Sequence, residues 1–126
     1  MKAYEILTLN GLFNEFENIN MDLDTACKIA DNISELETPV KLITKKRQEI
    51  VNKYGEKDEN GNIIENPENH EIKILDMNAF RSEFDELMEE EIEIKNLHKI
   101  TKDLLKKLKI TPKTIKTLKS ADLIAE

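Results

Sequence analysis

Residues 29–54 read IADNISELETPVKLITKKRQEIVNKY, and this stretch decides the fold. Its apolar residues recur at alternating spacings of 4 and 3, the heptad pattern of a helix that packs one narrow face against partner helices. We call this face the seam, and its members are Ile29, Ile33, Leu36, Val40, Ile43, Arg47, Ile50 and Tyr54. Only Arg47 is charged. The seam therefore predicts a protein that works by binding helices.

The composition is typical of a single helical domain. The chain has 126 residues, of which 36% are charged and 39% apolar, with three Gly and three Pro. Long amphipathic helices fit these values, because so few Gly and Pro residues leave little room for loops. No stretch approaches the roughly 20 apolar residues of a membrane span, and no signal peptide is recognisable. The sequence predicts a soluble, cytoplasmic protein without membrane association.

Two helices are predicted before residue 56. Apolar spacings of 3, 4 and 3 indicate a first helix over about residues 3–17. Its periodic residues are Ile6, Leu9, Phe13 and Phe16. The second helix has Asp22 or Asp24 available as its N-cap and runs to Tyr54. We expect Gly55 to form a left-handed C-terminal cap.

Pro39 interrupts the second helix. Its ring removes one backbone hydrogen bond and clashes with the preceding turn. Either the helix kinks there, or Thr38 caps a new helix with Pro39 in its first position. The seam continues across Pro39, which favours the kink. On the same helix, Cys27 cannot form an internal disulfide as the single cysteine, and we expect it to be a buried, small apolar residue.

The pattern changes to turn chemistry after Gly55. Asn60-Gly61 is a strong hairpin dipeptide, and apolar residues at 63–64 and 72–75 flank a second turn, so a small β-hairpin is predicted at 56–75. A third helix follows, capped by Asp76 or Asn78. Its apolar residues are Met77, Phe80, Phe84, Leu87 and Met88.

The rest of the chain predicts short elements. Residues 89–95 suit either a helix end or an edge strand, and the two alternatives stay open. Two short helices are expected at about 99–109 and 112–125. The fold class is mainly α: a long kinked central helix with antiparallel shorter helices in a coiled-coil-like arrangement, a small β-hairpin at 56–75 and two short C-terminal helices.

Charge divides the chain into two parts. Residues 97–126 have a net charge of +5, which leaves −12 for residues 1–96 of the total of −7. We predict a helical body with the hairpin at 1–96, and a basic segment at 97–126 packed on that body or on a partner subunit. The candidate basic surface is Lys99, Lys102, Lys106, Lys107, Lys109 and Lys113. Binding of this segment to nucleic acid is the less favoured alternative, because its short helices need a surface to cover their apolar residues.

No motif indicates a catalytic, cofactor or metal site. His70 and His98 lack the neighbouring ligands of a zinc site, and we expect both at the surface. The glutamates between 89 and 93 are typical of a solvated face rather than of acid–base catalysis. For Arg47 we predict an ion pair with a glutamate of the same chain. The sequence therefore predicts a protein that is not an enzyme and needs no cofactor.

Two segments carry a family resemblance. The stretch from Met21 to Ala30, MDLDTACKIA, and the later VNKYGE at 51–56 resemble a family of small uncharacterised helical proteins of phages and prophages of low-GC bacteria. The resemblance covers about residues 1–95. Asp22 and Leu23 stand where the family has Leu-Pro, and Pro39 is an added interruption. The resemblance implies a viral origin and supplies no catalytic residues.

These observations lead to one functional prediction and two alternatives. We predict a non-enzymatic phage or prophage protein that acts by protein–protein interaction, as a homo-oligomeric virion assembly or structural accessory component. Its location would be the bacterial host cytoplasm or the virion. One alternative is an inhibitor of a host defence protein, in which the acidic body mimics nucleic acid. The other is a nucleic-acid-binding module that uses the basic C-terminal helices.

Overall fold

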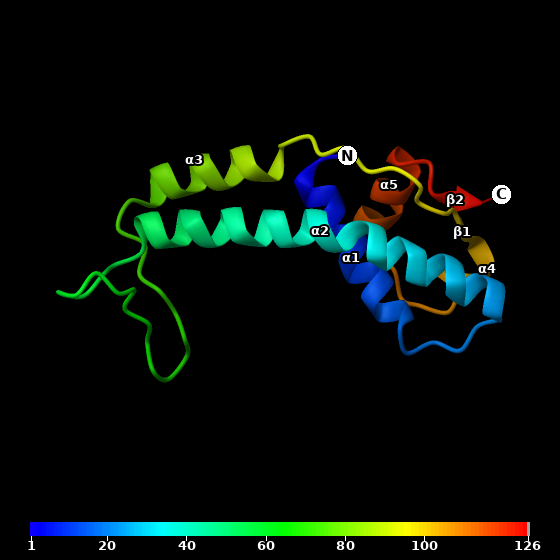
Figure 1. Cartoon of the computed structure of the whole chain (residues 1–126), viewed down its shortest axis with the longest axis horizontal. Helices are drawn as coiled ribbons and strands as arrows, with labels where there is room; N and C mark the ends of the chain where they lie inside the picture. The colour runs from blue at the N-terminus through cyan, green and yellow to red at the C-terminus, as the bar shows by residue number, and fades with distance from the viewer. Residues whose placement is uncertain (126) are drawn as a thin grey trace.

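The computed structural model describes residues 1–125, and helices dominate it, as the sequence predicted (Figure 1). The elements in this range are α1 (Ala3–Phe16), α2 (Leu23–Tyr54), α3 (Met77–Met88), β1 (Ile100–Thr101), α4 (Lys102–Leu105), α5 (Pro112–Ser120) and β2 (Ile124–Ala125). In Figure 1, α1 crosses α2 near its middle and α3 lies beside the C-terminal half of α2. None of the helices in the described range has the length and apolar character needed to cross a membrane.

The second helix is continuous through Pro39. It spans 32 residues, and Figure 1 shows a change of direction near its middle. The Asp22 carboxylate begins the helix by accepting a hydrogen bond from the Thr25 N–H at 3.0 Å. Hydrogen bonding with the side chain and then the backbone N–H of Thr25 lowers the pKa of Asp22. The long helix expected from the seam is therefore present, with Pro39 inside it.

Replacing Pro39 by Ala should stabilise the protein. Alanine restores a backbone donor inside α2 and removes the ring that clashes with the preceding turn, a defect that costs about 3 kcal/mol in a straight helix. We expect a higher melting temperature, measured by circular dichroism. Thr38→Ala, at an exposed neighbouring position, is the control and should change the melting temperature little. A fall for Pro39→Ala would mean that the core requires the bend.

The hydrophobic core surrounds α1. Its buried residues come from α1, from the first two thirds of α2 and from the C-terminal segment. They are Ala3, Ile6, Leu9, Leu12, Phe13, Phe16, Ile29, Leu36, Ile43, Ile100, Leu104, Leu105, Leu118 and Leu123. The C-terminal segment thus packs on α1 of its own chain, which covers the apolar residues that short helices would otherwise expose.

The helices predicted at 99–109 and 112–125 are shorter than expected. Ile100 and Thr101 pair in parallel with Ile124 and Ala125, and the Ile100 N–H donates to the Leu123 carbonyl at 2.6 Å. The Thr101 hydroxyl accepts from the Leu104 N–H at 3.2 Å, so the first helix begins only at Lys102. The residues that pair at the two ends of the C-terminal segment are therefore extended, although local periodicity assigns them to helices.

Residues 55–75 also differ from the prediction. Gly55 adopts φ −69° and ψ 143°, so the expected left-handed cap is wrong. A Cβ there would lie 2.8 Å from both Ile63 Cδ1 and the Val51 carbonyl oxygen, and this close approach is what needs glycine. In place of the two strands of the hairpin, isolated antiparallel bridges join Gly55 to Ile74, Lys57 to Ile63 and Glu65 to Ile72. The segment folds back on the end of α2 as a loop.

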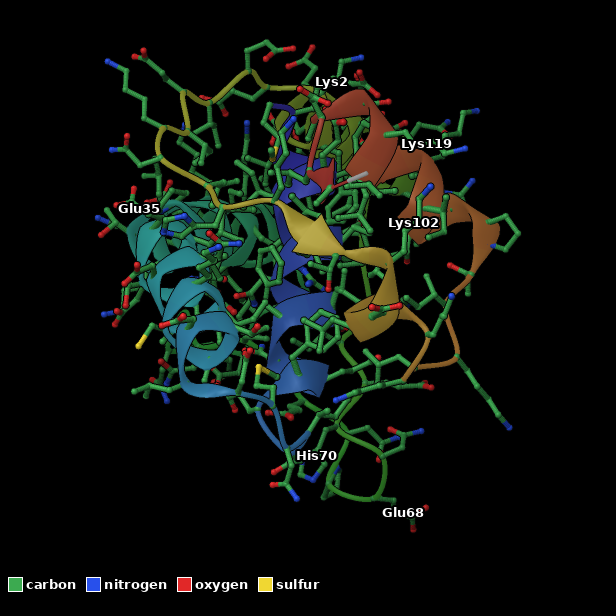
Figure 2. All side chains as sticks on the ribbon, turned by 90° about the vertical axis from the view of Figure 1, so that its right-hand side faces the viewer. Lys2, Glu35, Glu68, His70, Lys102 and Lys119 are labelled. Carbon is green, nitrogen blue, oxygen red and sulfur yellow. The ribbon has the colours of Figure 1, made fainter. Side chains whose placement is uncertain are left out.

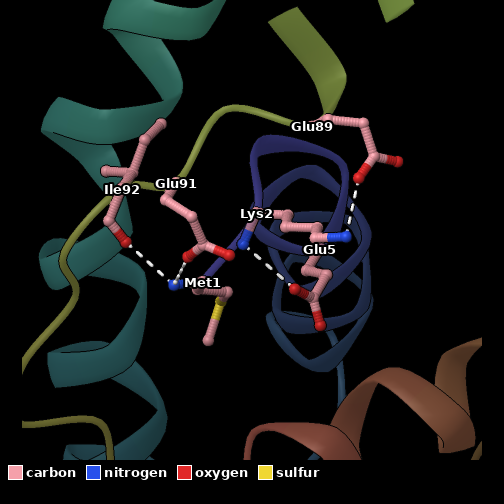
Figure 3. A network of polar contacts seen from close by, with 6 residues as sticks. All are labelled: Met1, Lys2, Glu5, Glu89, Glu91 and Ile92. Atoms are coloured by element: carbon pink, nitrogen blue, oxygen red, sulfur yellow. Dashed lines mark hydrogen bonds and ion pairs between the residues drawn. The ribbon is translucent and has the colours of Figure 1, made fainter. Parts of the chain in front are cut away.

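Residues 89–95 are neither helix nor regular strand in the structure. Figure 3 shows the start of the chain bound to this segment, with the Met1 amino group 3.1 Å from Glu91 Oε2 and 3.0 Å from the Ile92 carbonyl oxygen. Lys2 Nζ lies 2.6 Å from Glu89 Oε2, and an isolated antiparallel bridge joins Lys2 to Glu91. These contacts hold residues 89–95 extended across the start of α1, so helix α3 ends at Met88.

Candidate protein-interaction site

The seam binds helices of its own chain. Ile29, Leu36 and Ile43 are buried in the core, and Ile33 and Val40 pack against it. Both α1 and α3 contact α2. The heptad pattern therefore describes intramolecular packing over this part of the seam, and the remaining members, Arg47, Ile50 and Tyr54, lie beyond the core.

We call residues 44–87 the arm: the end of α2, the loop and α3 up to Leu87. Within it only Gly55 and Leu87 are buried, and the core cluster takes no residue from it. Figure 1 shows the arm extending away from the part of the molecule that contains α1 and α5. Two helices side by side can each bury one stripe only, so the arm leaves apolar surface open to a partner.

Three aromatic rings lie half-buried along the arm. The rings of Tyr54 and Phe80 meet edge to face with centroids 6.4 Å apart, and Phe80 stacks on Phe84 at 6.0 Å. Arg47 is exposed, with its guanidinium carbon 5.8 Å from the Phe84 centroid. The expected ion pair of Arg47 with a glutamate is wrong, since the face of Phe84 is its contact. Aromatic and arginine side chains of this kind dominate binding energy in many interfaces.

A groove of about 600 Å³ runs between α2 and α3 on the arm. Ile50 and Leu87 line it. Ile50 is half-buried, whereas Ile29, Leu36 and Ile43 of the seam are buried. Two ion pairs cross the groove, Lys53 to Glu83 at 2.6 Å and Lys46 to Glu90 at 2.7 Å. Hydrogen bonding to Lys53 lowers the pKa of Glu83, and hydrogen bonding to Glu83 raises the pKa of Lys53. Both pairs are partly exposed, so they bridge the two sides of the groove but add little stability.

The far end of the arm exposes large apolar side chains. Of the five exposed large hydrophobic residues in the described chain, three lie here: Ile64 at 43%, Leu75 at 64% and Met77 at 44% exposed. Sequence reasoning assigned them to a hairpin and a helix face and missed their exposure. Their exposure could have been inferred from their position in or beside a turn-forming segment, which lacks a regular apolar pattern that would cover them.

The predicted basic surface is divided among several places. Lys99 pairs with Asp122 at 3.2 Å, and Lys107 Nζ donates to the Asn20 carbonyl at 3.1 Å. Lys109 lies at a separate groove beside α1, and Lys113 is exposed near the start of α5. Lys102 and Lys106 instead border a third groove together with Lys119. Figure 2 shows Lys102 and Lys119 on the same side of the C-terminal segment.

That third groove, of about 420 Å³, has an apolar floor. Its floor consists of Leu105, Leu108, Ile110, Ile115 and Ile124, and its rim of Lys102, Lys106 and Lys119. We call it the lysine-rimmed groove. Leu105 belongs to the core, whereas the other four floor residues stay half-buried.

The remaining candidate residues lie apart from these surfaces. Cys27 is exposed, so its expected burial is wrong. His70 Nδ1 lies 2.9 Å from Glu65 Oε1, and both side chains are exposed. Within residues 1–125, no group of three or more His, Cys, Asp or Glu side chains is placed to hold a metal ion. No protein-family model, curated protein or solved structure matches the chain.

Proposed function

We propose that this protein acts by binding another protein through the arm, without catalysing a reaction. One observation carries the proposal: between residues 44 and 87 only Gly55 and Leu87 are buried, although the arm contains three aromatic rings and three exposed large apolar side chains. Exposed apolar side chains that concentrate at one end of a molecule are typical of an interaction site. In this proposal the arm is a coiled-coil-like helical hairpin with α3 antiparallel to α2.

The biological setting of the proposal comes from the family resemblance. A phage or prophage protein that binds through a projecting arm suits a virion assembly or structural accessory role. The alternative of an inhibitor that mimics nucleic acid has less support, because Lys53 and Lys46 of α2 pair with Glu83 and Glu90. A nucleic-acid-binding role has less support as well, since the basic residues 99–113 do not share one surface.

A capture experiment tests the arm. We expect Leu75→Ser/Met77→Ser to reduce the capture of proteins from a phage-infected bacterial lysate at least tenfold, because both side chains are exposed on the arm and removing them costs contact area. Leu23→Ser is the matched control, since Leu23 is 78% exposed at the other end of α2. Quantified bands on immobilised protein give the result. Equal capture by all three proteins, or no specific capture by the wild type, would contradict the proposal.

A further inference from the structure

The two ends of the molecule carry opposite charges. Residues 56–76, the loop at the far end of the arm, contain seven carboxylates and two lysines, a net charge of −5 with histidine neutral. Residues 97–126 have a net charge of +5. Figure 1 shows the loop at one end of α2 and the C-terminal elements at the other. The 32 residues of α2 extend for about 48 Å. This separation keeps the loop away from the basic end of its own chain.

Both ends combine their charge with open apolar surface. On the arm, Ile64, Leu75 and Met77 are exposed among the carboxylates. At the other end, the lysine-rimmed groove offers an apolar floor between positive side chains. Its volume of about 420 Å³ is enough for a few apolar side chains. The two surfaces therefore match in charge and in apolar character, which is the arrangement that favours and steers association.

We propose that the far end of the arm of one copy docks into the lysine-rimmed groove of a second copy. Carboxylates of the loop pair with the rim lysines, and exposed apolar residues of the arm cover the floor. The proposal rests on the proposed function, because it makes the arm the contact element and names a second copy as its partner. The two surfaces differ, so the contact is head-to-tail, and each bound copy leaves one groove and one arm free for the next.

The proposal predicts assemblies that grow with concentration. Sedimentation velocity of the full chain at low salt should show the average mass rising beyond a dimer. Raising the salt concentration should reduce assembly, since exposed charges are screened over about 10 Å at 0.1 M. A wild type that stays monomeric at every concentration, or stops at a dimer, would overturn the proposal.

Two variants and their mixture identify the interface. Lys102→Glu/Lys119→Glu changes the net charge of the three rim residues from +3 to −1, and Glu68→Lys/Glu71→Lys, at two exposed glutamates, reduces the net charge of the loop from −5 to −1. Each variant alone should be monomeric. An equimolar mixture should associate again, because the unchanged arm of the first variant fits the unchanged groove of the second. Circular dichroism verifies that both remain folded.

A matched control carries the same charge change elsewhere. Lys28→Glu/Lys41→Glu, at two exposed positions of α2 outside the arm, should assemble like the wild type. Single variants that still assemble, or a mixture that stays monomeric, would overturn the head-to-tail contact.

If self-association fails while Leu75→Ser/Met77→Ser still abolishes capture of another protein, only this inference is lost. If that double variant captures as well as the wild type, the proposed function is lost instead.

Discussion

Replacing Ile43 by Ala should lower the free energy of unfolding by about 2 to 5 kcal/mol. Ile43 is 1% exposed and belongs to the core cluster. Truncation removes buried apolar area and leaves a cavity that the surrounding residues fill only in part. Because domains of this size are stable by about 5 to 15 kcal/mol, the loss is a large fraction of the total. Urea unfolding followed by circular dichroism measures it.

The matched control for Ile43→Ala is Ile50→Ala, one heptad later on the same seam. Ile50 is half-buried and lines the open groove between α2 and α3, so water already reaches the space that truncation would leave. We expect it to cost about 1 kcal/mol. Equal losses for the two variants would mean that the arm is as tightly packed as the core, and the case for a partner on the arm would weaken.

Local sequence patterns predicted the long helices well. α1, α2 and α3 begin and end close to where apolar periodicity and capping residues placed them. Asp22 and Asp76 are the N-caps, and Asp76 accepts from the Ala79 N–H at 3.1 Å. An amphipathic helix and its cap depend on residues within a few turns of one another, so a single sequence contains the signal.

Pairing between distant residues explains the errors. The extended path of residues 89–95 depends on Met1 and Lys2, and the shortened helices of the C-terminal segment depend on the pairing of Ile100 with Ile124. Gly55 is needed because Ile63 and Val51 approach it closely. None of these contacts produces a periodic pattern in the sequence. Each joins segments that are distant in the sequence and that come together only in the complete fold.

The candidate site shows the same limit. The heptad seam indicated correctly that α2 packs against helices, and a heptad pattern contains no information on whether those helices belong to the same chain. The surfaces that remain open, Leu75 and Met77 on the arm and the lysine-rimmed groove, consist of residues without regular spacing. These surfaces can be recognised only when the burial of each residue is known, because the residue type alone does not say whether an apolar side chain is exposed.

Asn32→Leu should be as destabilising as Ile43→Ala. Asn32 is fully buried in α2, where its Nδ2 donates to the His98 carbonyl at 2.9 Å and its Oδ1 accepts from the His98 N–H at 2.7 Å. This side chain binds a segment 66 residues away and holds it against the helix. Leucine has a similar size but no polar atoms, so it leaves the His98 N–H and carbonyl without their partners. A buried polar group without a partner costs about 1 to 3 kcal/mol, so the loss of partners for both groups should cost about 2 to 6 kcal/mol.

Asn52→Leu is the matched control for this change. Asn52 lies on the same helix, is exposed, and bonds only its neighbour Gln48 at 3.0 Å. Its replacement should alter stability by less than about 0.5 kcal/mol, as for most surface positions. Hydrogen exchange adds a local readout: the His98 amide should lose protection in Asn32→Leu and keep it in Asn52→Leu. Retained protection in Asn32→Leu would contradict the role given to the Asn32 side chain, because residues 96–99 would then stay on the helix without its amide.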